Sequence, residues 1–380
     1  MNQTIDFDAE KQAAYQLINI KGVGIQSCIK LVTYAQDAKS ALQLSEHEVR
    51  DVLPKSSADA FVYGREKMTD TKIKELERKD KFLFVPYTSR KYPEKLKNIS
   101  NPPFVLYVRG ELPEENKPSV AIIGARACSE YGKAVARQFG KQLGAAGIQI
   151  ISGMAKGIDG IAQQGALDGG GKTYGILGSG VDVIYPPENE RLYHSIIGQG
   201  GIISEYPPGM EAQSAFFPQR NRIISGLADL LLVVEARKRS GTYITVTQAL
   251  EQGRDVFVVP GRITDTLSEG CNYLLTQGAG VAVSPECVME ELFRMKDVQI
   301  QNKQEPVENL KTPTGKGEKT LRDHIFSVLD ITPIALDAIY QTLQMKTRVS
   351  MEELLLELTK MQMTGVVAAT GNYYRLTCAL

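Results

Sequence analysis

Cations accompanied by glycine or serine follow several apolar runs of this sequence. Arg126, Lys156 and Lys238 each stand a few residues after such a run. Backbone N–H groups at a glycine-rich helix start bind anions, and a nearby fixed positive charge strengthens that binding. The pattern therefore predicts a site that binds phosphate groups. In these three loops the residues predicted to contact phosphate are Gly124, Arg126, Ser152, Gly153, Lys156, Lys238, Ser240 and Gly241.

A second cationic stretch, residues 216–224, places Arg220, Asn221 and Arg222 just before an apolar helix. Side chains two positions apart on an ordinary helix face different directions. Both arginines reach one target only if they lie in the first turn or in the loop before it, which Pro218 favours. We therefore expect all three residues at the phosphate site. The alternative is a solvated surface with one structural salt bridge.

The elements that must position these loops are short apolar strands, each followed by a helix. Residues 120–123, 148–151 and 173–177 are apolar without alternation, as expected of parallel strands buried on both faces. Between the first two, residues 131–145 carry one apolar stripe, which predicts a helix. Residues 230–234 form another such run. Strand, glycine loop and helix in series predict an α/β fold with a doubly wound parallel sheet, whose ligands bind at the carboxyl ends of its strands.

Composition narrows the class of protein. The chain has 380 residues with 44 basic and 44 acidic side chains, so a polyanion must be held by a local groove and not by a general positive field. The five cysteines are far apart and only three histidines are present, which favours reduced thiols and no metal site. No run reaches membrane-spanning length, and neither a Walker A nor a dinucleotide fingerprint is present. We therefore expect a cytoplasmic protein without membrane association, metal or cofactor.

Residues 1–70 are expected to form a separate helical module. Its turn at residues 21–24, Lys-Gly-Val-Gly, resembles a helix-hairpin-helix element, in which glycine amides contact a nucleic-acid phosphate. The acids Glu46, Glu48 and Asp51 instead favour a degenerate, SAM-like helical bundle that contacts protein. Both interpretations stay open.

Residues 71–296 are expected to form the main α/β domain. Its first part, residues 71–117, contains a charged helix and two strands, with turns fixed by prolines. Tyr87, Tyr92 and Tyr107 in this part could stack on nucleic-acid bases. Tyrosines beside a sheet more often pack in the core, and packing is the interpretation favoured here.

Several motifs match one known family, in the family's order, across residues 104–283. The chain resembles the DNA-processing protein A family, DprA, also called Smf. The motifs that carry the resemblance are GARACSEYG, SGMAKGIDGIAQQGAL, LGSGVDVIYPPEN, ISEYPPG, FPQRNRIISGLAD, VVEARKRSGTYITVTQALEQGRDVFVVPG and GCNYLLTQGAG.

The resemblance implies an extended Rossmann-like fold that binds single-stranded DNA, protects incoming DNA and loads the RecA recombinase during natural transformation and recombination. It also implies a homodimer formed through the Rossmann-like domain. Gln163 stands where the family commonly has histidine, a departure that bears on proton transfer and not on DNA binding. By the family pattern, the DNA-phosphate residues are Arg126, Lys156, Arg220, Arg222 and Lys238.

The C-terminal part of the sequence predicts a linker followed by a small domain. Residues 297–318 are polar and aperiodic with Pro and Gly, which predicts a linker. Residues 319–380 show three helical patterns and a terminal hairpin, an order that resembles the winged helix of many family members. The third helix would enter a DNA groove, but it carries Glu352, Glu353 and Glu357, which repel phosphates. We therefore expect this domain to contact another protein or to have a regulatory role.

The main alternative to DNA binding is a nucleotide-binding enzyme. Nucleotide phosphoribohydrolases of the lysine-decarboxylase-like group have a similar sheet with glycine loops, and their P-G-G-x-G-T-x-x-E motif places a catalytic acid after Gly-Thr. Here Gly241 and Thr242 are followed by Tyr243, Ile244 and Thr245, so that acid is missing. The sequence also shows no nucleophile with its base. It therefore predicts a DNA-binding protein that is not an enzyme.

Overall fold

Short apolar runs of the chain form a nine-stranded sheet in the computed structural model, with the strand order β1-β2-β6-β5-β4-β3-β7-β8-β9. Seven neighbouring strands, β6-β5-β4-β3-β7-β8-β9, run parallel to one another. At one edge β2 pairs antiparallel with β6, and β1 pairs antiparallel with β2. This confirms the predicted α/β fold with a mostly parallel sheet. The strands are β1 (Leu83–Pro86), β2 (Val105–Gly110), β3 (Ser119–Ile123), β4 (Gln149–Ser152), β5 (Thr173–Ile176), β6 (Gly200–Ser204), β7 (Leu230–Val233), β8 (Asp255–Val258) and β9 (Gly280–Val281).

The order of the strands reverses at β3. From β3 the chain continues to β4, β5 and β6 on one side, and then returns to β7, β8 and β9 on the other. The connections that leave the carboxyl ends of β3 and β7 therefore diverge. A crevice forms where neighbouring parallel strands send their connections in opposite directions, and ligands of such sheets bind there.

Helices cover both faces of the sheet because successive side chains of a strand point to opposite faces. Val120 and Ile122 of β3 lie in one apolar cluster with Phe139 of α8, whereas Ala121 and Ile123 belong to the cluster that contains residues of α11. The centres of these strands are therefore apolar on both faces, as the uninterrupted runs predict. The helices that follow β3 are α8 (Glu130–Ala145), α9 (Ile158–Asp168), α10 (Glu190–Gly198), α11 (Phe216–Leu227), α12 (Thr242–Glu251), α13 (Glu269–Thr276) and α14 (Pro285–Asn302).

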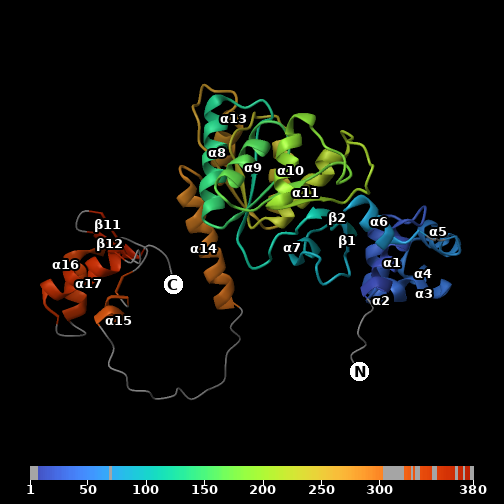
Figure 1. Cartoon of the computed structure of the whole chain (residues 1–380), viewed down its shortest axis with the longest axis horizontal. Helices are drawn as coiled ribbons and strands as arrows, with labels where there is room; N and C mark the ends of the chain where they lie inside the picture. Colours follow the sequence, from blue (N-terminus) through green and yellow to red (C-terminus); the bar gives the residue numbers. More distant parts are fainter. Residues whose placement is uncertain are drawn as a thin grey trace, which may run out of the picture. The chain divides into compact units, whose positions relative to one another are not determined.

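N-terminal helices gather beside β1 and β2 (Figure 1). Their contact with the sheet includes an edge-on pair of Tyr15 and Phe84, with ring centroids 5.8 Å apart, and Phe84 meets Tyr107 in the same way at 5.5 Å. Tyr92 and Tyr107 are buried, as expected for tyrosines that pack in the core. These helices are α1 (Phe7–Ile18), α2 (Ile25–Ala35), α3 (Ala38–Gln43), α4 (Glu46–Val52), α5 (Lys55–Arg65), α6 (Ile73–Asp80) and, after β1, α7 (Glu94–Lys97).

The chain divides into two compact units, residues 1–303 and 304–380. The second has its own apolar cluster, which includes Ile325, Ile339 and Leu358. Helix α14 ends at Asn302, so the start of the segment predicted as a linker is helical. The described elements of the second unit are α15 (Leu321–Phe326), α16 (Leu336–Gln344), α17 (Met351–Met363) and a three-stranded antiparallel sheet of β10 (Ile334–Ala335), β12 (Tyr373–Leu376) and β11 (Val367–Thr370).

The structure describes most of the chain, and none of the helices described is long and apolar enough to cross a membrane. The described residues are 7–67, 71–302, 321–326, 328–329, 334–344, 349–363, 367–370 and 373–376.

Close contact between α8 and α9 depends on glycine, and we predict that Gly140→Ala destabilises the first unit. An added Cβ at Gly140 would lie 2.1 Å from the carbonyl oxygen of Ala162, so the backbone of one helix must move. We expect a loss of about 1–3 kcal/mol in the free energy of unfolding, measured by urea denaturation. Gly198→Ala is the matched control, because its Cβ would meet nothing within 4 Å. Equal stability of the two variants would contradict this account of the packing.

Candidate functional site

A cavity and an adjoining groove lie at the carboxyl ends of the parallel strands, where the strand order reverses. The cavity has a volume of about 110 Å³, and the groove about 650 Å³. The groove is lined by residues that follow β3 and β7, the two strands whose connections diverge. Five residues line both spaces: Arg126, Ala155, Tyr185, Phe217 and Arg220.

Arg220 is the buried cation of this site. Its side chain extends from α11 beneath the cavity, and only 3% of the residue is exposed. One terminal nitrogen, Nη1, donates to the carbonyl oxygens of Gly153 and Ile176, at 2.6 Å for Gly153. These carbonyls belong to the ends of β4 and β5, so one guanidinium ties two strand ends to α11. Its Nε has no hydrogen-bond partner among the described residues.

Asp159 partly balances the charge of Arg220. Burial lowers the pKa of Arg220 to about 10, and Asp159 acts in the opposite direction, so Arg220 stays charged at neutral pH. Burial likewise raises the pKa of the Asp159 carboxyl, while Arg220 and the backbone amides of Ala155 and Gly153 lower it. The Gly153 amide donates to Asp159 Oδ2 at 3.2 Å. The pair therefore fixes the loop that follows β4.

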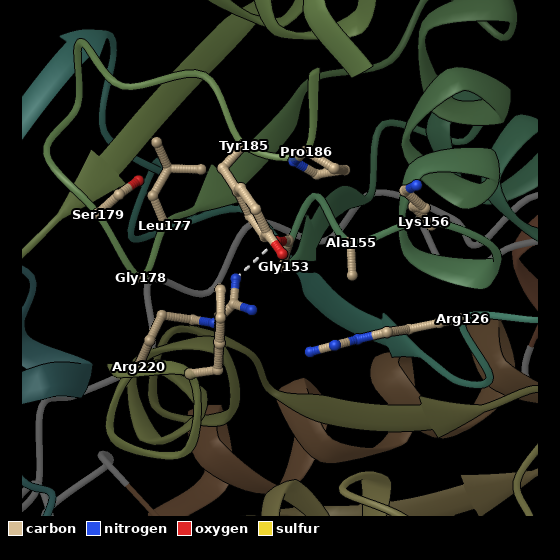
Figure 2. A pocket seen from close by; sticks show the side chains of 11 residues that line it. Arg126, Gly153, Ala155, Lys156, Leu177, Gly178, Ser179, Tyr185, Pro186 and Arg220 are labelled. Atoms are coloured by element: carbon tan, nitrogen blue, oxygen red, sulfur yellow. Dashed lines mark hydrogen bonds between the residues drawn. The ribbon is translucent and has the colours of Figure 1, made fainter. Parts of the chain in front are cut away.

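Arg126 and two aromatic rings form the accessible part of the cavity. Figure 2 shows the side chains of Arg126, Arg220 and Tyr185 converging on it from three different elements. The Arg126 guanidinium carbon lies 5.5 Å from the ring centroid of Phe217, and the Arg220 guanidinium carbon lies 5.9 Å from it. Tyr185 is 45% exposed, and its ring is 5.5 Å from that of Phe217 at 32°. An exposed guanidinium thus lies beside flat, partly exposed rings.

Lys156 lines the same cavity from the loop between β4 and α9. It forms an ion pair with Glu188, and both side chains are mostly exposed. Asn189, next to Glu188, donates to the carbonyl oxygens of Met154 and Ala155 at 2.8 and 3.3 Å. The loop that carries Lys156 is therefore held by hydrogen bonds that do not involve its own side chain.

The loop after β7 completes the groove with Ser240 and Gly241. Gly241 directly precedes α12, so the start of this helix lies at the groove, where the Tyr243 and Ile244 amides donate to the carbonyls of Ser240 and Gly241. The Ser240 hydroxyl is buried and has no partner within the described part of the chain. Lys238 is exposed, and its Nζ lies 5.8 Å from the ring centroid of Tyr273. It is carried by this loop but does not line the groove.

Some predicted residues serve the framework of the site. The Ser152 hydroxyl is buried and donates to the carbonyl of Ile122 at 2.6 Å, so it does not face the groove. Gly124 lies on the groove, and a Cβ there would be 2.7 Å from Ile158. Its small size is what allows α9 to approach. Asn221 is half-buried and lines the groove.

The structure separates Arg222 from the other cations, contrary to the expectation of a common target. Helix α11 begins at Phe216, so Arg220 and Arg222 lie beyond its first turn and project to different sides. The Arg222 guanidinium forms two bonds of 2.6 Å to the Glu205 carboxylate, and its Nε donates to the Asn101 carbonyl at 2.7 Å. The alternative of one structural salt bridge therefore describes Arg222.

The residues that sequence reasoning missed are mainly aromatic or acidic. Tyr185 and Phe217 line both spaces, Glu188 forms an ion pair with Lys156, and the charge of Asp159 acts on Arg220. Tyr185 lies in the proline-containing stretch after β5, and Phe217 stands three positions before Arg220. Their proximity to the cation-bearing loops was the available clue. No group of three or more His, Cys, Asp or Glu side chains that could hold a metal occurs among the residues that the structure describes.

The geometry suits a ligand that carries both phosphate groups and flat rings. Residues 83–293, which span the sheet and the site, match the family model of the DNA recombination-mediator protein A. The chain belongs to this family, and the resemblance to DprA and Smf proteins seen in its motifs is confirmed. Over 280 residues it is 36% identical to the DNA processing protein DprA of Streptococcus pneumoniae, covering 73% of this chain and 97% of that protein.

Two solved structures extend the comparison to the fold. The crystal structure of DprA from S. pneumoniae matches with a TM-score of 0.65 at 34% identity, covering 75% of this chain and 97% of that chain. DNA processing protein A from Helicobacter pylori matches with a TM-score of 0.50 at 29% identity, covering 56% of this chain and 97% of that chain. The latter structure is described as giving insight into a unique single-stranded DNA binding mode of that protein.

Arg222→Ala should destabilise the protein strongly. Removal of the guanidinium leaves Glu205 buried without its partner, and breaking a buried ion pair in this way costs about 3–5 kcal/mol. Arg126→Ala removes an exposed guanidinium and should change stability by less than about 0.5 kcal/mol. Urea denaturation of both variants distinguishes the two environments. A similar unfolding midpoint for Arg222→Ala and the unsubstituted protein would refute the structural role of this arginine.

Proposed function

We propose that this chain is a recombination mediator that binds single-stranded DNA along the groove at the carboxyl ends of its parallel strands. The observation that carries the proposal is the position of exposed Arg126 over the Phe217 ring, with the Tyr185 ring beside it. A guanidinium next to exposed rings contacts a phosphate while the neighbouring base stacks. Membership of the recombination-mediator family supports the same ligand.

Single strands fit this arrangement better than duplex. The faces of duplex bases are covered by stacking on their neighbours, so only an unpaired base is free to stack on Tyr185 or Phe217. Cations that bind the phosphate backbone hardly distinguish one base sequence from another, and binding that depends on them weakens as the salt concentration rises. The groove should therefore accept most single-stranded sequences.

The residues fall into two proposed roles. Arg126, Lys156 and Lys238 hold backbone phosphates, assisted by Ser240, Gly241 and the start of α12. Tyr185 and Phe217 stack on bases. Arg220 attracts phosphate electrostatically from beneath the cavity. A buried charge acts through a medium less polarisable than water, so its field is less weakened. Gly124, Ser152, Gly153 and Arg222 support the loops, and Asn221 contributes a polar group to the groove wall.

Family membership supports a wider role in recombination. We infer that the protein protects incoming single-stranded DNA and loads the RecA recombinase onto it during natural transformation. A homodimer formed through the Rossmann-like domain would place two grooves on one particle and would raise the effective affinity for a long strand.

For the C-terminal unit we propose a winged helix that contacts protein. Helix α17 exposes Glu352 and Glu353, and Glu353 is fixed by bonds with Ser350. These carboxylates would face phosphates if α17 entered a DNA groove, and they would repel them. A partner protein with a basic surface suits this helix better.

The proposal predicts preferential binding of single strands and two variants that weaken it. Fluorescence anisotropy with labelled oligothymidylate should show tighter binding than duplex of equal length, and affinity should fall as salt rises. Arg126→Ala and Lys156→Ala should each weaken binding, because each removes one phosphate contact, and Arg126→Ala should also lower the salt slope by about one unit.

The control for these variants is Lys172→Ala. Lys172 directly precedes β5 and therefore lies at the amino ends of the parallel strands, away from the groove, where it pairs with Glu111 and Glu114. This substitution removes the same charge and should leave the affinity unchanged. Equal affinity for duplex and single strands would refute the proposed binding mode. So would equal effects of Arg126→Ala, Lys156→Ala and Lys172→Ala on the affinity.

Deletion of residues 319–380 should leave most of the single-strand affinity intact. The proposed contacts all lie in the first unit, which has its own core and should fold alone. The truncated protein should remain a dimer in light scattering and should lose partners that recognise the tail. Loss of oligothymidylate binding by a truncated protein whose circular dichroism spectrum shows a folded core would show that the C-terminal unit contacts DNA.

A further inference from the structure

One cation of the cavity beside the groove is already paired with a carboxylate in the protein. Lys156, in the loop after β4, forms an ion pair with Glu188, which lies in a short 3-10 helix (Pro187–Asn189) directly before α10. Their side chains are 56% and 59% exposed, so solvent and ligands reach both groups. The hydrogen bond from Lys156 lowers the pKa of Glu188, which keeps the carboxylate charged at neutral pH.

The ion pair is not needed to hold the loop of Lys156. Asn189 bonds to the carbonyls of Met154 and Ala155, and the Asp159 carboxylate accepts from the Gly153 amide. These bonds hold residues 153–155 directly before Lys156, and the Ile158 amide after it donates to the Ala125 carbonyl at 3.2 Å. Exposed ion pairs, in contrast, contribute little to stability. The main effect of Glu188 is therefore electrostatic, and it acts on the ligands of Lys156.

Glu188 also belongs to the segment that lines the cavity. Tyr185 and Pro186 of the same segment form part of the cavity wall, and Lys156 forms another part. A strand whose base stacks on Tyr185 would bring its backbone close to Lys156. The phosphate then meets a lysine that Glu188 already neutralises.

We propose that Glu188 competes with DNA phosphate for Lys156 and thereby sets the affinity of the groove for single strands. This inference rests on the proposed function. Binding exchanges the Lys156–Glu188 pair for a Lys156–phosphate contact and leaves Glu188 as a free carboxylate near the DNA. That carboxylate attracts cations from solution, which offsets part of the counterion release that drives binding.

The test is the affinity of Glu188→Gln for oligothymidylate in the full-length protein. Glutamine keeps the size of the side chain and removes the charge. We expect binding about two- to fivefold tighter than in the unsubstituted protein, as follows from the strength of an exposed ion pair. The salt slope should become steeper by up to about one unit, because no carboxylate is released.

Glu190→Gln is the matched control. Glu190 is the first residue of α10, is exposed and carries the same charge a short distance along the chain. Its substitution should change the affinity much less than Glu188→Gln does. Equal tightening in both variants would mean a general effect of net charge, and the proposal would be wrong.

A double-mutant cycle with Lys156→Ala separates this inference from the proposed function. Without the lysine, Glu188→Gln should lose most of its effect, because the two groups are coupled. If Lys156→Ala weakens binding but Glu188→Gln does not tighten it, only the competition is refuted. Tightening by Glu188→Gln that persists without Lys156 also refutes it. If Lys156→Ala has no effect, the assigned role of Lys156 in DNA binding fails as well.

Discussion

The groove depends on one buried guanidinium. Arg220 fastens the carbonyl ends of β4 and β5 to α11, and it lies beside the Asp159 carboxylate beneath the cavity. A buried charge requires partners, because its desolvation is otherwise too costly. The loops after β4 and β5 are thus held where their carbonyls satisfy Arg220. The exposed groups of the site, Arg126 and Lys156, are arranged around this fixed point.

The topology of the sheet explains why cations distant in the sequence meet. Parallel strands bring all their carboxyl ends to one edge, and the reversal of order at β3 opens a crevice between the connections of β3 and β7. The loops with Arg126, Tyr185 and Ser240 lie on that crevice, and Lys156 lines the adjoining cavity. A chain with equal numbers of acidic and basic side chains thus concentrates positive charge locally.

Sequence patterns predicted the sheet and its loops better than the directions of individual side chains. Apolar runs that end in glycine located β3, β4 and β5, because a strand buried on both faces must be apolar throughout. The direction of the Arg222 side chain could not be predicted from such a pattern. Its direction depends on where α11 begins, and its partner Glu205 comes from a different loop. Tyr185 and Phe217 were missed because an aromatic residue in a motif predicts core packing until its exposure is known.

The decisive measurement for DNA binding in this groove is a crystal structure with a short oligothymidylate bound. We expect a backbone phosphate within hydrogen-bonding distance of the Arg126 guanidinium and a thymine stacked on Phe217 or Tyr185. The Lys156 amino group should have moved from Glu188 to a phosphate. An oligonucleotide bound outside this groove, with Arg126 and Phe217 still facing solvent, would refute the proposed binding site.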